Sequence, residues 1–180
     1  MRKLRIHELD RLSNGEFKLA PKVPIIVVLD NIRSLHNVGS VFRTADAFRL
    51  EAVYLCGITA QPPHREIEKT ALGATDTVEW KYFEDTLKAV EALRADGYHL
   101  TAVEQAEGSV DLRKWEPHRA VKAALILGNE VKGVQQKVID ACDNCLEIPQ
   151  FGTKHSLNVS VSSGIVLWEA VKPLLAQLEP

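Results

Sequence analysis

The 180-residue chain lacks the motifs that most readily assign a protein to a nucleotide-binding or zinc-hydrolase class. No two glycines lie two residues apart, so the G-x-G-x-x-G dinucleotide fingerprint is absent. Gly128 and Gly133 have the spacing of a Walker A loop, but Val-Gln follows where Lys-Ser or Lys-Thr is required. The metalloprotease motif H-E-x-x-H is also absent. These absences exclude the most familiar signatures for phosphate loops and catalytic zinc.

Cysteine, long apolar runs and excess positive charge are scarce as well. Three cysteines cannot all pair within one chain, which favours a reducing compartment. The lone pair Cys142 and Cys145 would need two further ligands to hold zinc, so we expect a helix end followed by a strand, and no metal. No apolar run reaches the roughly 18 to 20 residues of a membrane span, and no secretory signal is evident. We therefore expect a cytoplasmic protein with no membrane partner.

The formal net charge of -2 and the pI near 6.3 argue against nucleic-acid binding through overall charge, although a local basic patch remains possible. The hydrophobic share of 46% and the charged share of 26% are those of an ordinary globular protein. The length fits one domain, and the sequence contains no internal repeat or linker.

Short apolar runs alternate with amphipathic segments along the chain. The expected strands are Val23–Leu29, Glu51–Cys56, Tyr98–Glu104, Ala123–Leu127 and Cys145–Ile148. The expected helices are Asn37–Phe48, Pro62–Leu72, Glu84–Ala95, Val134–Cys142 and Ser156–Leu178, the last weakened at Gly164 and Pro173. This alternation predicts an α/β fold with a mostly parallel sheet covered by helices on both faces.

Three polar loops at expected strand ends carry candidate ligand-binding residues. The loop after the first strand leads to Asn37, a plausible helix N-cap, and to Arg43, which leans back towards a helix N-terminus that would accept an anion. The second loop contains Gly128, which would let a ligand approach the backbone, and presents Glu130. The structural alternatives are a capping asparagine, a surface arginine and an ordinary strand-to-helix turn.

The third polar loop begins the last helix with Ser156 and Asn158. Ser156 alone is explained as an N-cap, but Asn158 has poor helix propensity and is harder to explain in that position. In an open α/β sheet, ligands bind beyond the carboxyl ends of the strands, where all three loops are expected.

Taken together, these segments resemble the three motifs of the SpoU (TrmH) group of the SPOUT superfamily, which are S-adenosylmethionine-dependent RNA 2′-O-ribose methyltransferases. The matching segments are Asn37-Val-Gly-Ser-Val-Phe-Arg-Thr-Ala45, Leu127-Gly-Asn-Glu130 with Gly133, Ile148-Pro149, Ser156-Leu-Asn-Val-Ser160 and the intermediate Lys69-Thr-Ala-Leu-Gly-Ala74. The resemblance covers roughly residues 22 to 175.

The resemblance implies a sheet whose C-terminal part is threaded into a deep trefoil knot that binds S-adenosylmethionine. It places Val103, Gly128, Ile148, Ser156 and Leu157 in the cofactor pocket. It places Arg43, Asn37, Glu130, Ser156 and Asn158 on the catalytic surface.

The resemblance leaves the role of Arg43 open. Family members are proposed to use an arginine at this position to activate the ribose hydroxyl. Neutralising an arginine at pH 7 costs about 7.5 kcal/mol, so Arg43 either becomes a base beside a phosphate or stays charged and clamps that phosphate. Glu130 could orient Asn37 or Arg43, or act as a base. A structural ion pair between Glu130 and Arg43 is the alternative to both roles.

The expected organisation is a short basic extension at 1–20 and a SpoU-type domain at 21–180. The extension could form a basic amphipathic helix carrying Arg2, Lys3, Arg5 and Arg11, with Arg33, Lys154 and His155 adding charge near the site. No aromatic residue for base stacking can be identified.

The surplus of apolar residues on the last helix, including Val161, Ile165, Trp168 and Leu174-Leu175, predicts a homodimer, with a core helix as the structural alternative. Transfer RNA is the expected substrate, with ribosomal RNA as the alternative. A non-catalytic protein that binds S-adenosylmethionine or RNA is the alternative of a different class.

Overall fold

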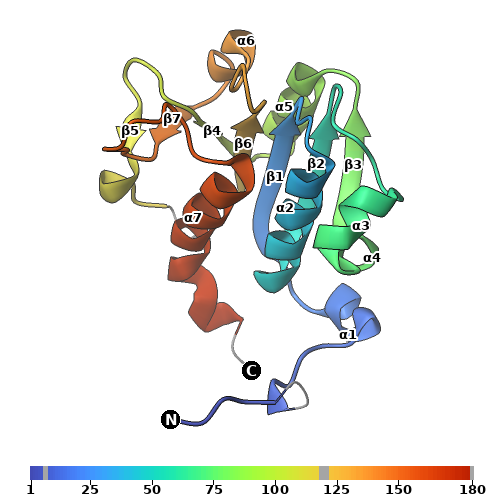
Figure 1. The fold of residues 1–180 in the computed structure, drawn as a ribbon. Coiled ribbons are helices and arrows are strands. Elements are labelled where there is room, and N and C mark those ends of the chain that lie inside the picture. The colour runs from blue at the N-terminus through green and yellow to red at the C-terminus, as the bar shows by residue number, and fades with distance from the viewer. Residues whose placement is uncertain (6–7, 118–121, 179–180) are drawn as a thin grey trace.

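The computed structural model describes residues 1–5, 8–117 and 122–178 (Figure 1). Seven strands form one sheet in the order β3-β2-β1-β6-β4-β7-β5, and every neighbouring pair is parallel. The strands are β1 (Val23–Asp30), β2 (Leu50–Cys56), β3 (Glu79–Phe83), β4 (His99–Val103), β5 (Val110–Asp111), β6 (Ala123–Gly128) and β7 (Asn144–Glu147). The predicted parallel α/β sheet is confirmed.

Helices cover both faces of this sheet. The α-helices are α1 (Asn14–Leu19), α2 (Leu35–Ala47), α3 (Arg65–Ala71), α4 (Ala74–Thr77), α5 (Thr86–Ala95), α6 (Gln136–Ile139) and α7 (Val159–Val171), and the 3-10 helices are η2 (Leu112–Lys114) and η3 (Lys172–Gln177). One hydrophobic cluster joins α1, α2, α3, α4 and α7 to one sheet face, and a second joins α5 and α6 to the other. Figure 1 shows α2 and α7 side by side on the near face.

The central strand β1 explains how the site is positioned. Its residues Val27, Val28 and Leu29 are fully buried because helices cover both of its faces. At its end, Asp30 pairs in register with Cys56 of β2 and with Gly128 of β6. The chain therefore leaves β1 and β6 at the same sheet edge, where a parallel sheet binds its ligands.

The two long helices begin at other residues than the sequence predicts. Helix α2 begins at Leu35, and Ser34 rather than Asn37 is its N-cap, because the Ser34 hydroxyl accepts a hydrogen bond from the backbone N–H of Asn37. Helix α7 begins at Val159, and Asn158 rather than Ser156 is its N-cap. These shifts free the side chain of Asn37 for another contact.

Three further helix boundaries also differ. Helix α6 is shorter than predicted because side-chain carboxylates accept the backbone N–H groups of Val134 and Gln135. Helix α3 starts after the prolines, with His64 as its cap. Helix α7 is continuous through Gly164, whereas Pro173 lies in η3, since proline cannot supply the N–H that an α-helix needs.

The sequence did not reveal some short elements. Strand β3 is an edge strand with mostly exposed side chains, so it carries no apolar run, and β5 has only two residues. The described residues of the N-terminal extension form no α-helix before α1, so the basic amphipathic helix expected there is wrong for those residues. The trefoil knot stays a prediction.

The apolar residues of α7 divide into a buried set and an exposed set. The segment Val159–Ala176 has a mean hydropathy of 1.3 and would be long and apolar enough for a membrane span by composition alone, unlike the expectation from the sequence. Six residues of α7 are buried, which is what a core helix requires. Leu174 is buried too, so it belongs to the core and not to the exposed surplus. Val161, Ile165 and Trp168 are exposed along one stripe.

Candidate active site

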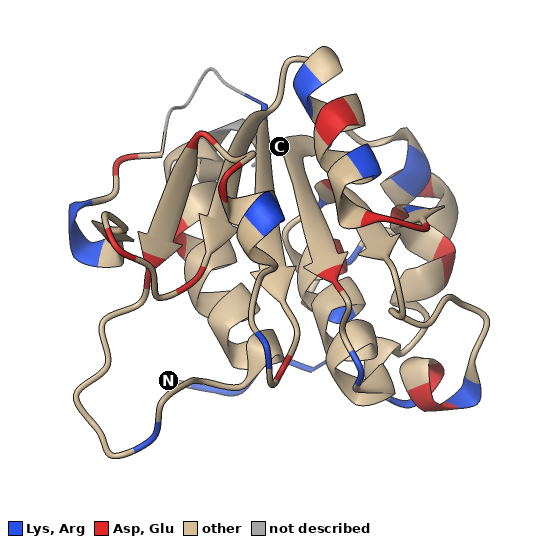
Figure 2. Ribbon diagram, turned by 90° about the horizontal axis from the view of Figure 1, so that it is seen from above, with Lys and Arg blue, Asp and Glu red and all other residues tan. Residues whose placement is uncertain are grey.

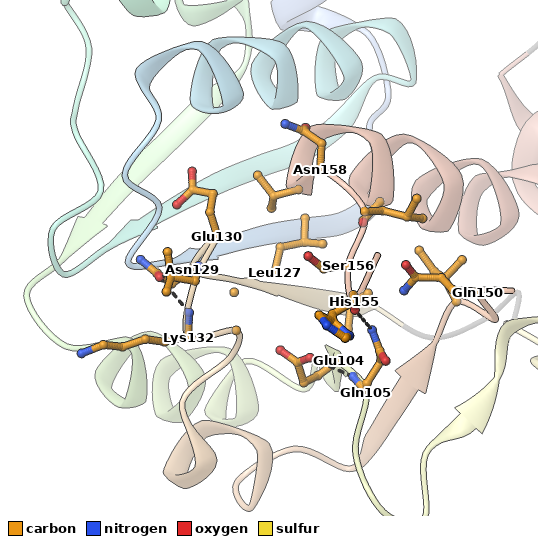
Figure 3. Close-up of a pocket in the computed structure, with 18 of the residues that line it drawn as sticks. Glu104, Gln105, Leu127, Asn129, Glu130, Lys132, Gln150, His155, Ser156 and Asn158 are labelled. Carbon is orange, nitrogen blue, oxygen red and sulfur yellow. Dashed lines mark hydrogen bonds between the residues drawn. The ribbon is translucent and has the colours of Figure 1, made fainter. Parts of the chain in front are cut away.

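A pocket of about 560 Å³ opens at the carboxyl ends of β4, β6 and β7 (Figure 3). Its apolar wall is formed by Val103, Leu127, Leu146, Ile148 and Leu157. Its polar side chains come from Glu104, Gln105, Asn129, Glu130, Lys132, Gln150, His155, Ser156 and Asn158. This volume and this mixture of apolar wall and convergent polar groups suit a small organic ligand.

The structure gathers the five predicted cofactor-binding residues in this one pocket. Val103, Gly128, Ile148, Ser156 and Leu157 all line it. They come from β4, from the end of β6 and from the segment between β7 and α7, so only the parallel register brings them together. Their role in binding a cofactor stays a prediction.

Glu130 lies in the turn after β6, and its carboxylate reaches the start of α2. The Oε2 atom accepts a hydrogen bond from the backbone N–H of Arg33 at 2.9 Å, and Oε1 accepts one from that of Ser34 at 2.9 Å. Oε1 also accepts from the Asn37 side-chain amide at 3.0 Å. The N-terminus of this helix favours an anion, and the sequence analysis expected a ligand there. In the structure the Glu130 carboxylate occupies that position.

Two opposing effects act on the Glu130 carboxyl. Partial burial raises its pKa, while the hydrogen bonds from Arg33, Ser34 and Asn37 lower it. The hydrogen bonds prevail, so the pKa of Glu130 lies below the ordinary glutamate value. A carboxylate with a lowered pKa is a weaker base, which favours an orienting role for Glu130.

Asn37 links Glu130 to the last helix. It is buried, and its Oδ1 accepts a hydrogen bond from Asn158 Nδ2 at 3.2 Å. Because Glu130 can only accept, Asn37 must present its NH2 group there and its oxygen to Asn158. Asn158 Oδ1 in turn accepts from the backbone and hydroxyl of Ser160. The Glu130–Asn37–Asn158 chain thus connects the ends of β6, α2 and α7.

Arg43 lies apart from this chain of hydrogen bonds. It is exposed on the outer side of α2 and is not among the residues that line the pocket. Within the described part of the chain its guanidinium forms no hydrogen bond or ion pair. The alternative of an ion pair between Glu130 and Arg43 is therefore wrong, because other donors surround the Glu130 carboxylate.

Sequence reasoning missed a clasp formed by the residues that follow β4. Glu104 Oε2 accepts from the backbone N–H of Val134 at 2.8 Å, and Gln105 Nε2 donates to the backbone oxygen of His155 at 2.7 Å. These two bonds tie together the loops after β4, after β6 and before α7. The sequence feature that could have revealed this clasp is a glutamate directly after an apolar strand.

Contacts within the chain require the two glycines in the turn after β6. A Cβ on Gly128 would overlap the backbone of Gly133 and Val134, so the tight turn itself requires this glycine, and its contact with a ligand stays a prediction. Gly133 has a φ of +67°, and a Cβ there would run into the Glu104 carboxylate. Both glycines therefore let the turn close against the clasp.

An apolar-walled pocket above the ends of a parallel sheet, with a carboxylate–amide chain at its rim, defines an α/β ligand-binding domain with an adjoining polar surface. The chain belongs to the SpoU rRNA Methylase family, whose model matches residues 24–168. The family predicted from the three motifs is confirmed.

Individual relatives agree with this assignment. The chain is 32% identical over 167 residues to the 23S rRNA (guanosine-2'-O-)-methyltransferase RlmB of Neisseria meningitidis, which covers 93% of this chain and 64% of the relative. The AdoMet-bound rRNA methyltransferase of Sinorhizobium meliloti has a TM-score of 0.79 at 30% identity, covering 86% of this chain and 58% of that one. The chain thus spans less than two thirds of these two relatives.

A third relative is more nearly of the same length. The TrmH/SpoU tRNA modifying enzyme of A. aeolicus has a TM-score of 0.77 at 25% identity. The match covers 89% of this chain and 80% of that one. Most of this chain therefore matches a part of each of these proteins.

Proposed function

We propose that the chain is an S-adenosylmethionine-dependent RNA methyltransferase that methylates a ribose 2′-hydroxyl. This proposal rests on one observation: the predicted cofactor-binding residues and two predicted catalytic residues lie next to each other. The five expected cofactor residues line one pocket, and Glu130 and Asn158 lie at its rim, joined through Asn37. The names of the Neisseria and Sinorhizobium relatives support the same activity.

The residues of the pocket fit S-adenosylmethionine, which supplies an electrophilic methyl group when bound. Val103, Ile148 and Leu157 offer apolar contact to a purine, and the Ser156 hydroxyl and nearby backbone offer hydrogen bonds. The Glu104 carboxylate adds an acceptor on the opposite wall for hydroxyl or ammonium groups.

The chain's own residues must bind the RNA and help the ribose hydroxyl to lose its proton. Glu130 orients Asn37, and Asn37 in turn orients Asn158 at the rim. Arg43 has a free guanidinium fork, which either clamps a phosphate beside the ribose or takes the proton in a desolvated site. Both roles for Arg43 require the substrate to bridge from α2 to the pocket.

Ribosomal RNA is the substrate class with the broader support, because the named relatives that are at least 30% identical act on rRNA. This reverses the preference that the sequence alone suggested. Transfer RNA is the second candidate, favoured by the tRNA modifying enzyme of A. aeolicus, of which the match covers 80%.

We further propose a homodimer through the exposed stripe of α7. Val161, Ile165 and Trp168 are 50%, 37% and 46% exposed, and such a stripe on a helix is costly to leave in water. Ile165→Asp should give monomers in sedimentation velocity, whereas an unchanged sedimentation coefficient would assign the interface to another surface.

The deciding experiment is transfer of labelled methyl from S-adenosylmethionine to purified rRNA and, separately, to total tRNA. Alkali-resistant 2′-O-methylated dinucleotides from one pool, lost with Arg43→Ala, would establish the reaction and the substrate class. Binding of S-adenosylmethionine without transfer to either pool would favour the non-catalytic alternative.

A further inference from the structure

Phe151 stands out among the aromatic residues because no described partner explains its position. Its side chain is 88% exposed, the highest value of any aromatic residue in the described part of the chain. The other two aromatics recorded as exposed have partners: Trp168 packs on Phe48 at 6.1 Å between ring centroids, and the Tyr82 hydroxyl donates to Gly57. Within the described residues, the face of the Phe151 ring is therefore open to a planar ligand.

The loop that carries Phe151 is held at the mouth of the pocket. Gln150 and His155, on either side of Phe151, both line the pocket (Figure 3). The backbone oxygen of His155 accepts the hydrogen bond from Gln105, which fixes this end of the loop to β4. Phe151 itself is not a lining residue, so its ring is presented beside the pocket rather than into it.

One exposed lysine lies on the same loop as this ring, and two other exposed cations lie elsewhere near the sheet edge. Lys154 is on the same loop, Lys132 lines the pocket, and Arg33 follows β1, and all three are exposed. None of them forms an ion pair with another residue that the structure describes. Lys and Arg segments are otherwise interleaved with Asp and Glu, as Figure 2 shows from above. An exposed aromatic ring and an unpaired cation on one loop suit a base and a neighbouring phosphate of a single strand.

We propose that Phe151 is a stacking platform for an unpaired nucleobase next to the ribose that enters the pocket, with Lys154 on an adjoining phosphate. This inference rests on the proposed RNA methyltransferase function. A phenyl face stacks on any base, so the contact would hold a flipped or single-stranded nucleotide without selecting its sequence. Base identity would then have to be determined elsewhere on the enzyme.

The test uses two fluorescein-labelled 12-mers at low salt: oligoadenylate, and an abasic RNA with the same number of phosphates. Phe151→Ala should weaken oligoadenylate binding about 5- to 100-fold in fluorescence anisotropy and leave abasic binding unchanged. Phe151→Trp should retain the affinity, since its ring also stacks. Lys154→Ala should weaken both oligomers alike, because its contact is electrostatic. Leu19→Ala, at a 90% exposed site on α1, is the matched surface control.

Each other outcome overturns the stacking contact in an identifiable way. Equal binding by Phe151→Ala and wild type, in an enzyme that still methylates rRNA or tRNA, would remove the platform and leave the function standing. Loss of the dimer in sedimentation velocity together with RNA binding would assign Phe151 to a contact between two copies. A raised Kd for S-adenosylmethionine alone would assign it to the cofactor. Wild-type protein that binds neither oligomer and transfers no methyl group would overturn both proposals.

Discussion

Two groups of polar residues lie at the same edge of the sheet and differ in what surrounds them. Asp30, at the end of β1, is fully buried, and its carboxylate accepts four hydrogen bonds, from Asn31, Thr86 and twice from Gln135. A second group consists of exposed side chains that have no described ion pair: Lys132, which lines the pocket, and Arg33, Arg43 and Lys154, which lie outside it.

The difference separates residues that shape the site from residues that are free to bind a ligand. Around Asp30 each partner contributes to holding α5 and the β6–α6 turn on the sheet, so its hydrogen bonds are already used within the fold. In the second group, the charged side chains keep their hydrogen-bonding capacity for something outside the chain. Substitutions in the first group should lower stability, and those in the second should lower activity without unfolding the protein.

The largest effect on stability is expected at Asp30. Asp30→Ala leaves the buried hydroxyl of Thr86 and the partly buried donors of Gln135 without an acceptor, so the free energy of unfolding should fall by about 3 to 5 kcal/mol. Urea denaturation followed by circular dichroism measures this loss. Asp76→Ala, at an exposed site on α4, should cost less than about 1 kcal/mol. Equal losses in the two variants would show that the Asp30 network does not hold the fold.

Arg43 represents the second group, the exposed side chains without a described ion pair. Arg43→Lys keeps the charge but loses the planar fork, so kcat for methyl transfer should fall about 100-fold or more while the urea midpoint stays unchanged. Arg65→Lys, exposed on α3, is the matched control. Activity within a few-fold of wild type in Arg43→Lys, together with loss in Glu130→Gln, would contradict an arginine-centred mechanism.

The same contrast explains how much the sequence could predict. Apolar runs identify β1 and β6 because burial on both faces demands them, and the three motifs identify Glu130 and Asn158. Partners distant in sequence cannot be assigned in this way: the bond between Asn37 and Asn158 joins residues 121 positions apart. The same limit applies to the clasp at Glu104, whose carboxylate meets the chain 30 residues later. Only the parallel register brings those atoms together.

Two glycines in the loops around the pocket, Gly133 and Gly152, allow a similar comparison. Gly133 has a positive φ, and a Cβ there would displace the Glu104 carboxylate, whereas Gly152 has open space and no positive φ. Gly133→Ala should therefore cost about 1 to 2 kcal/mol in the free energy of unfolding and raise the Kd for S-adenosylmethionine, because the turn that lines the pocket must shift. Gly152→Ala should change neither quantity in urea denaturation and calorimetric titration. A neutral Gly133→Ala would mean that the turn is not set by the clasp.

Glu130 stands between the two groups, since it is exposed yet its carboxylate is fully engaged at the start of α2. Because folding lowers the pKa of Glu130, its charge stabilises the fold above the ordinary glutamate pKa of about 4.3. This contribution, below about 1 kcal/mol, is lost as the pH falls through the lowered folded-state pKa.

The difference in unfolding free energy between wild type and Glu130→Gln should therefore stay constant from about pH 7 to pH 5 and shrink below about pH 4. Urea titrations at each pH measure it. Glu91→Gln serves as the control, because Glu91 is exposed and accepts no hydrogen bond from the part of the chain that the structure describes. A difference that grows as the pH falls would mean that the Glu130 carboxylate is strained in the fold. It would then be held ready to take a proton, and the base role would replace the orienting one.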